Sequence, residues 1–158
     1  MIPTDTFKRQ QSDILDLAKR ISERLDEGPL TAQVDEILFM LRGLKDKVTI
    51  HLAAEDQLLF PRLERNTSDE LAFMARQFRG ELATLCQDIA DFTARWDDKN
   101  IILVQPSRFL RETGGLLAVL GHSLERERVR LYPLLVTVQW PSRATSSGGN
   151  VTVLSSVA

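Results

Sequence analysis

The chain contains 158 residues, of which 43% are hydrophobic and 27% are charged, and it carries a net charge of −2 at pH 7. This length and composition suit one globular domain with a packed core. The charge argues against nucleic acid as a partner, because there is no excess of basic side chains to neutralise phosphates. The single cysteine excludes an intrachain disulfide and any zinc site built from several cysteines.

The apolar segments are too short for a membrane-spanning protein. None of them approaches the ~20 residues that cross a bilayer. The first residues, MIPTDTFKRQQSD, lack the apolar stretch of a signal peptide. We therefore expect a cytoplasmic protein that does not enter a membrane.

The first half of the chain predicts two helices. Apolar residues at helical spacing predict the first over about residues 5–25, and the Gly-Pro pair at 28–29 ends it. Thr31 is the expected N-cap of the second helix. We expect this helix to weaken near Pro61, which lacks a backbone donor, and to end by residue 66.

The second half predicts two more helices. Ser68, followed by two acidic residues, is the expected N-cap of the third. A polar linker at 97–100 separates it from the fourth, for which Pro106 is well placed in the first turn. The fourth helix is expected to run to about residue 136, with a bend at the glycine pair 114–115.

Four amphipathic helices with short connections predict an all-α fold, an up-down-up-down four-helix bundle. We assign this bundle to residues 1–140. From residue 141 the composition changes to serine, glycine, threonine and small residues. That change predicts a flexible C-terminal tail over residues 141–158.

Two of the helices repeat one motif. Glu55 lies six residues before the proline of a Phe-Pro pair, and Glu127 lies six residues before the proline of a Tyr-Pro pair. At about 100° per residue, both glutamates lie on the apolar track of their helix, as does His51. An isolated charge in a protein core costs several kcal/mol, so something must compensate these carboxylates.

A third carboxylate, Glu81, lies toward the edge of the apolar arc of the third helix. Carboxylates this close persist if a cation lies between them, if they are protonated, or if a basic side chain such as Lys47 reaches in. Iron and manganese match the oxygen and nitrogen ligands that such a core would offer. The pattern therefore predicts a candidate cation site.

The sequence His51-x-x-x-Glu55 followed by Leu-Phe-Pro, with a second Glu…Leu-Tyr-Pro on the last helix, resembles the hemerythrin-like (HHE cation-binding) family over about residues 7–135. The resemblance implies an up-down bundle that holds a di-iron centre. Members bind oxygen, sense iron, oxygen or redox state, or handle peroxide and nitric oxide. Carried over, it implies a metal-ligand set with one further histidine out of register: His51, Glu55, Glu81, Glu127 and His122.

The match to the family's histidines is partial. Gln11, Gln77 and Ser123 stand where the resemblance implies histidine. The remaining set lacks the five histidines that reversible oxygen carriage uses. We therefore expect a hemerythrin-like cation-binding protein that holds iron, as one ion or a di-iron pair, or manganese. Its expected role is that of a sensor or stress-response regulator rather than an oxygen carrier.

Two other functions stay open. In the first, the bundle is metal-free and serves as an interaction or regulatory module for a protein partner or a second copy of itself. Its polar core would then be satisfied by Lys47, waters or shared protons. In the second, the protein is an enzyme such as a peroxide-consuming di-iron protein, which the small number of histidines does not favour.

Overall fold

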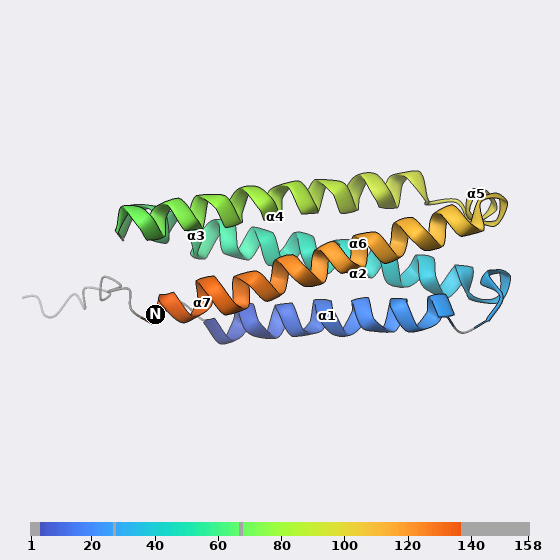
Figure 1. The fold of residues 1–158 in the computed structure, drawn as a ribbon, viewed down its shortest axis with the longest axis horizontal. Coiled ribbons are helices and arrows are strands. Elements are labelled where there is room, and N and C mark those ends of the chain that lie inside the picture. Colours follow the sequence, from blue (N-terminus) through green and yellow to red (C-terminus); the bar gives the residue numbers. More distant parts are fainter. Residues whose placement is uncertain (1–3, 27, 67, 137–158) are drawn as a thin grey trace, which may run out of the picture.

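The structure is a computed structural model that describes residues 4–26, 28–66 and 68–136. Four long helices run side by side (Figure 1). They are α1 (Thr4–Asp26), α2 (Leu30–Leu58), α4 (Asp69–Arg95) and α6 (Pro106–Arg126). Shorter helical segments are α3 (Phe60–Asn66), α5 (Lys99–Val104), the π-helical turn η1 (Glu127–Leu131) and α7 (Tyr132–Leu135).

The long helices form the predicted bundle. Helix α1 packs against α2 and α6, and α4 packs against the same two helices from the other side. Segments α3 and α7 lie at one end of the bundle, and α5 lies at the other (Figure 1). The all-α, up-down-up-down architecture is thereby confirmed, whereas the predicted tail at 141–158 lies outside the described residues. Within those residues, no helix is long and apolar enough to cross a membrane.

The start of α2 differs from the prediction. The helix begins at Leu30, and Pro29 occupies the N-cap position with φ −64° and ψ 133° and no side-chain hydrogen bond. The fixed φ of proline suits this extended conformation just before a helix. Thr31 therefore lies inside the first turn, and its assignment as the N-cap is wrong.

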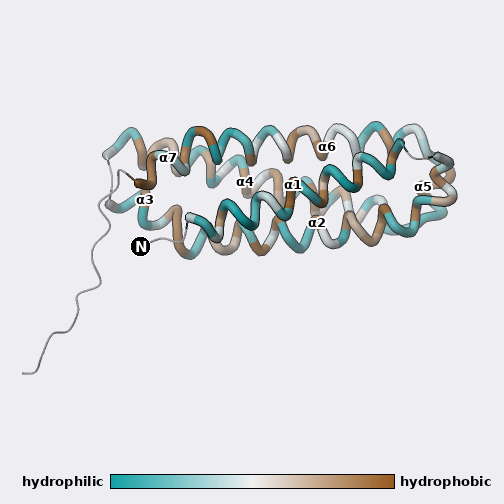
Figure 2. The backbone as a smooth tube through the Cα atoms, turned by 90° about the horizontal axis from the view of Figure 1, so that it is seen from below, coloured by the Kyte–Doolittle hydropathy of each residue, from teal (hydrophilic) through white to brown (hydrophobic). Residues whose placement is uncertain are grey.

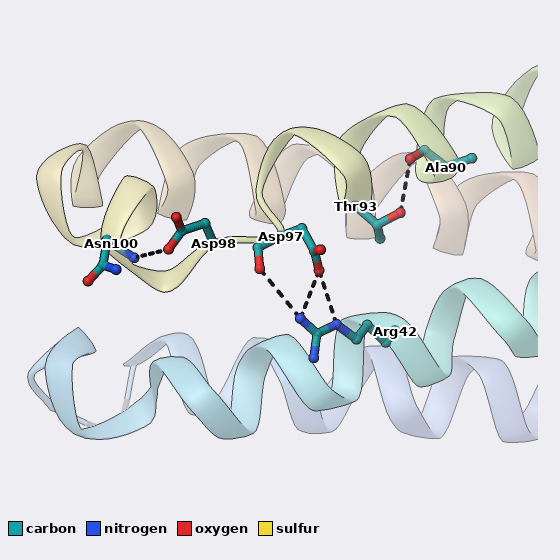
Figure 3. A network of polar contacts seen from close by, with 6 residues as sticks. All are labelled: Arg42, Ala90, Thr93, Asp97, Asp98 and Asn100. Atoms are coloured by element: carbon teal, nitrogen blue, oxygen red, sulfur yellow. Dashed lines mark hydrogen bonds and ion pairs between the residues drawn. The ribbon is translucent and has the colours of Figure 1, made fainter.

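The start of α4 agrees with the prediction, because Ser68 Oγ accepts a hydrogen bond from Leu71 N at 3.3 Å. The expected linker after α4 is partly helical. Asp98 Oδ1 accepts from Asn100 N at 2.8 Å and so caps α5 (Figure 3). In the same view, Arg42 of α2 reaches Asp97 Oδ1 with Nη2 at 2.7 Å, which ties the connection to α2.

The last helix is irregular near its end and not at its glycine pair. Helix α6 passes through 114–115 without interruption. It widens instead at η1, where the N–H of Tyr132 donates to the carbonyl of Glu127. Pro133 supplies the physical reason, because its ring clashes with the carbonyl four residues earlier in a regular α-helix. Pro61 has the matching effect on α2, where the chain leaves the helix at Leu59 and re-enters it as α3.

The bundle core is apolar along most of its length. Hydrophobic and hydrophilic positions alternate along each long helix (Figure 2). Near α5 the core is aromatic, with the ring centroids of Trp96 and Phe109 5.5 Å apart. The polar or charged side chains buried among the described residues are Gln11, His51, Glu55, Thr113 and Glu127. Thr113 bonds to a carbonyl of its own helix, but the other four gather in one place.

Candidate metal centre

The polar cluster includes residues near the end of α2, next to α3, and in η1, next to α7, and these short helices mark one end of the bundle (Figure 1). His51 and Glu55 are one turn apart near the end of α2, and Glu127 is the first residue of η1. The two glutamates are 0% exposed and His51 is 2% exposed. One ligand atom from each of these three residues lies within 4.8 Å of the others, which is close enough to share one metal ion.

Tyr132 joins the two carboxylates. Its Oη lies 2.7 Å from Glu55 Oε1 and 2.9 Å from Glu127 Oε1. A phenol has one hydrogen to donate, so it can satisfy one carboxylate at a time. Gln11 of α1 supplies a further donor, because its Nε2 lies 2.9 Å from Glu127 Oε1.

The π-helical turn brings Tyr132 to this position. On a regular α-helix a residue five positions after Glu127 would point about 140° away from it. In η1 the backbone bond from Tyr132 N to Glu127 O instead stacks the two residues one wide turn apart. The irregularity that Pro133 imposes therefore builds part of the site.

His51 is oriented through its second ring nitrogen. Nδ1 lies 2.9 Å from Gln10 Oε1. Because an amide oxygen only accepts, Nδ1 carries the hydrogen. In the neutral ring, Nε2 then has a free lone pair that faces Glu55 Oε1 at 3.1 Å and Glu127 Oε1 at 3.5 Å. This tautomer can bind a metal through Nε2, and it is held by an outer hydrogen bond of the kind that metal-ligating histidines make.

Four buried side-chain atoms in the described part of the chain have no hydrogen-bond partner, and all four belong to this cluster. They are Gln11 Oε1, His51 Nε2, Glu55 Oε2 and Glu127 Oε2. Although His51 Nε2 is near Glu55 Oε1, the contact lacks hydrogen-bond geometry. With the hydrogen of the ring on Nδ1, all four atoms are acceptors. A cation can bind to all of these acceptor atoms. An imidazole nitrogen together with carboxylate oxygens is a ligand set suited to iron or manganese.

Protons compete with a cation for the same atoms. Burial lowers the pKa of His51, but its interactions with the nearby carboxylates of Glu127 and Glu55 outweigh burial and raise it to about 9. Burial raises the pKa of Glu55 to about 8, with a further rise from Glu127 and an opposing effect from His51. Burial and the two carboxylates also raise the pKa of Tyr132, which keeps it a phenol. Without a cation, the cluster therefore holds protons at neutral pH.

Glu81 and His122 lie outside this cluster. Glu81 is exposed, and its Oε2 accepts from Arg126 Nη1 at 2.7 Å. On the helical wheel, Glu81 lies about 80° from the centre of the buried face of α4. His122 is also exposed, because it lies nearly opposite to the buried face of α6. The side chain of Lys47 is likewise exposed, so it does not supply the charge that the buried carboxylates need.

Sequence reasoning did not expect two members of the cluster, Gln11 and Tyr132, although the family resemblance had placed Gln11 at the position of a histidine. Gln11 lies on the same inward track as Phe7 and Ile14, and this position was the available signal that its amide is buried. Tyr132 carried no such signal, because regular helical spacing places it away from Glu127. Helix α4 adds no polar side chain to the cluster, because its buried residues, among them Ala75, Phe78 and Leu82, are all apolar.

A buried histidine and two glutamates, contributed by α2 and η1, are the kind of side chains with which helical bundles bind metal cations between their helices. The family model of the hemerythrin HHE cation binding domain matches residues 2–135. The chain therefore belongs to this family. A search of curated proteins and a search of solved structures found no match.

Proposed function

We propose that this protein binds one iron or manganese ion through His51, Glu55 and Glu127, and that it acts in the cytoplasm as a sensor or stress-response regulator. The observation that carries the proposal is the set of four buried acceptors without donors. A buried polar atom without a partner costs about 1–3 kcal/mol, and an ionised one costs more. A divalent cation between two ionised carboxylates removes this cost and neutralises their charge.

The composition of the site supports sensing over oxygen carriage. His51 is the one imidazole in the cluster, and the positions that the family resemblance assigns to further histidines hold Gln11, Gln77 and Ser123. The ligands of one ion would come from α2 and from η1, so an ion there would link α2 to the irregular end of the last helix. Uptake of the ion would thereby stabilise η1 and α7 against the bundle, which is the kind of change that a sensor transmits.

Elemental analysis by plasma mass spectrometry tests the proposal. The protein is purified without tag or chelator and then treated anaerobically with Fe(II) or Mn(II). We expect about one ion per chain in the wild type and a loss of the ion in His51→Ala. His122→Ala is the matched control, because it removes the other histidine of the chain from an exposed site and should retain the ion. A wild type without metal, or a His51→Ala variant that keeps it, would overturn the proposal.

One observation favours a second candidate function, a metal-free interaction or regulatory module. His51 lies between two carboxylates, and its pKa of about 9 allows an imidazolium to provide the positive charge. In that case the wild type stays metal-free after anaerobic loading, and its partner is another protein or a second copy. Light scattering of the metal-free protein would then distinguish a dimer from a monomer that needs a different partner.

A further inference from the structure

We infer that Gln11 supplies a fourth ligand to the ion through its amide carbonyl Oε1, giving a site of one nitrogen and three oxygens. This inference rests on the proposed function. The four ligand atoms would be Gln11 Oε1, His51 Nε2, Glu55 Oε2 and Glu127 Oε2. These are the four buried side-chain atoms that lack a partner in the described part of the chain.

The burial of Gln11 is the first step of the argument. Its side chain is 1% exposed and lies on the inward face of α1 between Phe7 and Ile14, both 0% exposed. Burying an amide without hydrogen bonds costs free energy, so a glutamine at this position needs partners at both ends of the amide. The nitrogen has one in Glu127 Oε1 at 2.9 Å, but the oxygen has none.

The orientation of the amide is fixed by its neighbour. If nitrogen and oxygen exchanged places, the carbonyl oxygen would face Glu127 Oε1 at 2.9 Å, and two acceptors would repel each other. The nitrogen therefore points at Glu127 and the carbonyl remains free. Since the two atoms of one amide are about 2.2 Å apart, Oε1 lies no more than about 5 Å from Glu127 Oε1. That distance keeps the carbonyl beside the carboxylate of Glu127.

The neighbouring side chains that are described leave the carbonyl without a donor. The hydroxyl of Tyr132 is directed at the two carboxylates, and Nδ1 of His51 is directed at Gln10. Across the core, the buried residues of α4 are all apolar. When both carboxylates are ionised, a cation or a water molecule is therefore the remaining kind of partner.

The carbonyl would set the charge and preference of the site. Two ionised carboxylates balance one divalent cation, and a neutral amide adds a ligand without adding charge. Three oxygens and one imidazole nitrogen favour manganese(II) and iron(II) over zinc more than a histidine at the same position would. Gln11 is thus inferred to be both a ligand and a determinant of metal preference.

Anaerobic titration calorimetry with Mn(II) on the full chain tests this role. Gln11→Met keeps the size of the side chain but has neither carbonyl nor N–H, and we expect at least tenfold weaker binding. Gln11→Glu lacks the N–H but keeps an oxygen ligand, and we expect binding at least tenfold tighter than in the wild type. Gln10→Glu is the matched charge control, because it adds the same charge one residue away, at the acceptor of His51 Nδ1.

The outcomes separate the possible roles of Gln11. A gain in Gln11→Glu that exceeds the gain in Gln10→Glu supports ligation. Weaker binding in both Gln11 variants would show that Gln11 only donates to Glu127, and unchanged binding in both would show that water partners the carbonyl; either result overturns the inference. Failure of the proposed function looks different, because the wild type itself would then bind no Mn(II). Thermal unfolding of each variant confirms that it is folded before titration.

Discussion

The most specific prediction concerns alkaline pH and the metal-free protein. His51 has a pKa of about 9 in the folded state against an ordinary value of 6.5, and Glu55 has about 8 against 4.5. Both pKa values are higher in the folded protein than in the unfolded chain. At a pH between the ordinary and the raised pKa of each group, the folded protein therefore binds more protons than the unfolded chain does. The free energy of unfolding must therefore fall as pH rises. The contribution of His51 to the free energy of unfolding is complete below pH 6.5 and is lost as the pH rises through 9. The contribution of Glu55 is complete below pH 4.5 and is lost as the pH rises through 8.

The magnitude follows from the same values. One pKa unit corresponds to about 1.4 kcal/mol. The rise in the pKa of His51 therefore corresponds to about 3 kcal/mol of stability, and the rise in the pKa of Glu55 to about 5 kcal/mol. Because the two groups interact, their protons leave in coupled steps and the contributions do not add. We expect the free energy of unfolding to drop by about 3 kcal/mol between pH 6.5 and pH 9.

Urea unfolding in the presence of a chelator measures this drop. The double variant His51→Gln, Glu55→Gln has no titrating side chain at these two positions, and its stability should change by less than about 1 kcal/mol over the same range. His122→Gln serves as the control, because it removes the exposed histidine and should keep the full drop. An equal decline in the wild type and the double variant would refute the reasoning.

Three further substitutions test the structure. Tyr132→Phe removes the hydroxyl that contacts both buried carboxylates, and urea unfolding at pH 7 should show a loss of about 2 kcal/mol; an unchanged stability would contradict the assigned contacts. Ser68→Ala should cost about 1 kcal/mol through the lost N-cap, whereas Thr31→Ala, inside the first turn of α2, should cost less than about 0.5 kcal/mol in the same assay. Glu81→Gln breaks only an exposed ion pair with Arg126, so Mn(II) affinity by calorimetry should stay within about twofold, and a tenfold loss would place Glu81 in the site after all.

The sequence alone determined the bundle. Apolar spacing near 3.6 residues, together with the prolines and glycines between the periodic stretches, predicted four helices, and short connections make neighbouring helices antiparallel. The burial of Glu55 and Glu127 followed in the same way, because each lies on the apolar track of its helix and a helix presents such a track to the core. These features depend on local periodicity, which the sequence contains in full.

The tertiary structure decided which polar groups meet. Glu81 lay at the edge of an apolar arc, and only packing showed that α4 turns Phe78 and Leu82 inward and leaves Glu81 with Arg126. Tyr132 reaches Glu127 because η1 widens the helix before Pro133, a change of backbone that regular spacing cannot express. The contact of Gln11 with Glu127 joins residues 116 positions apart. A single helical wheel places a side chain on a face but not opposite a particular partner, so the composition of this site is set by the way the helices pack.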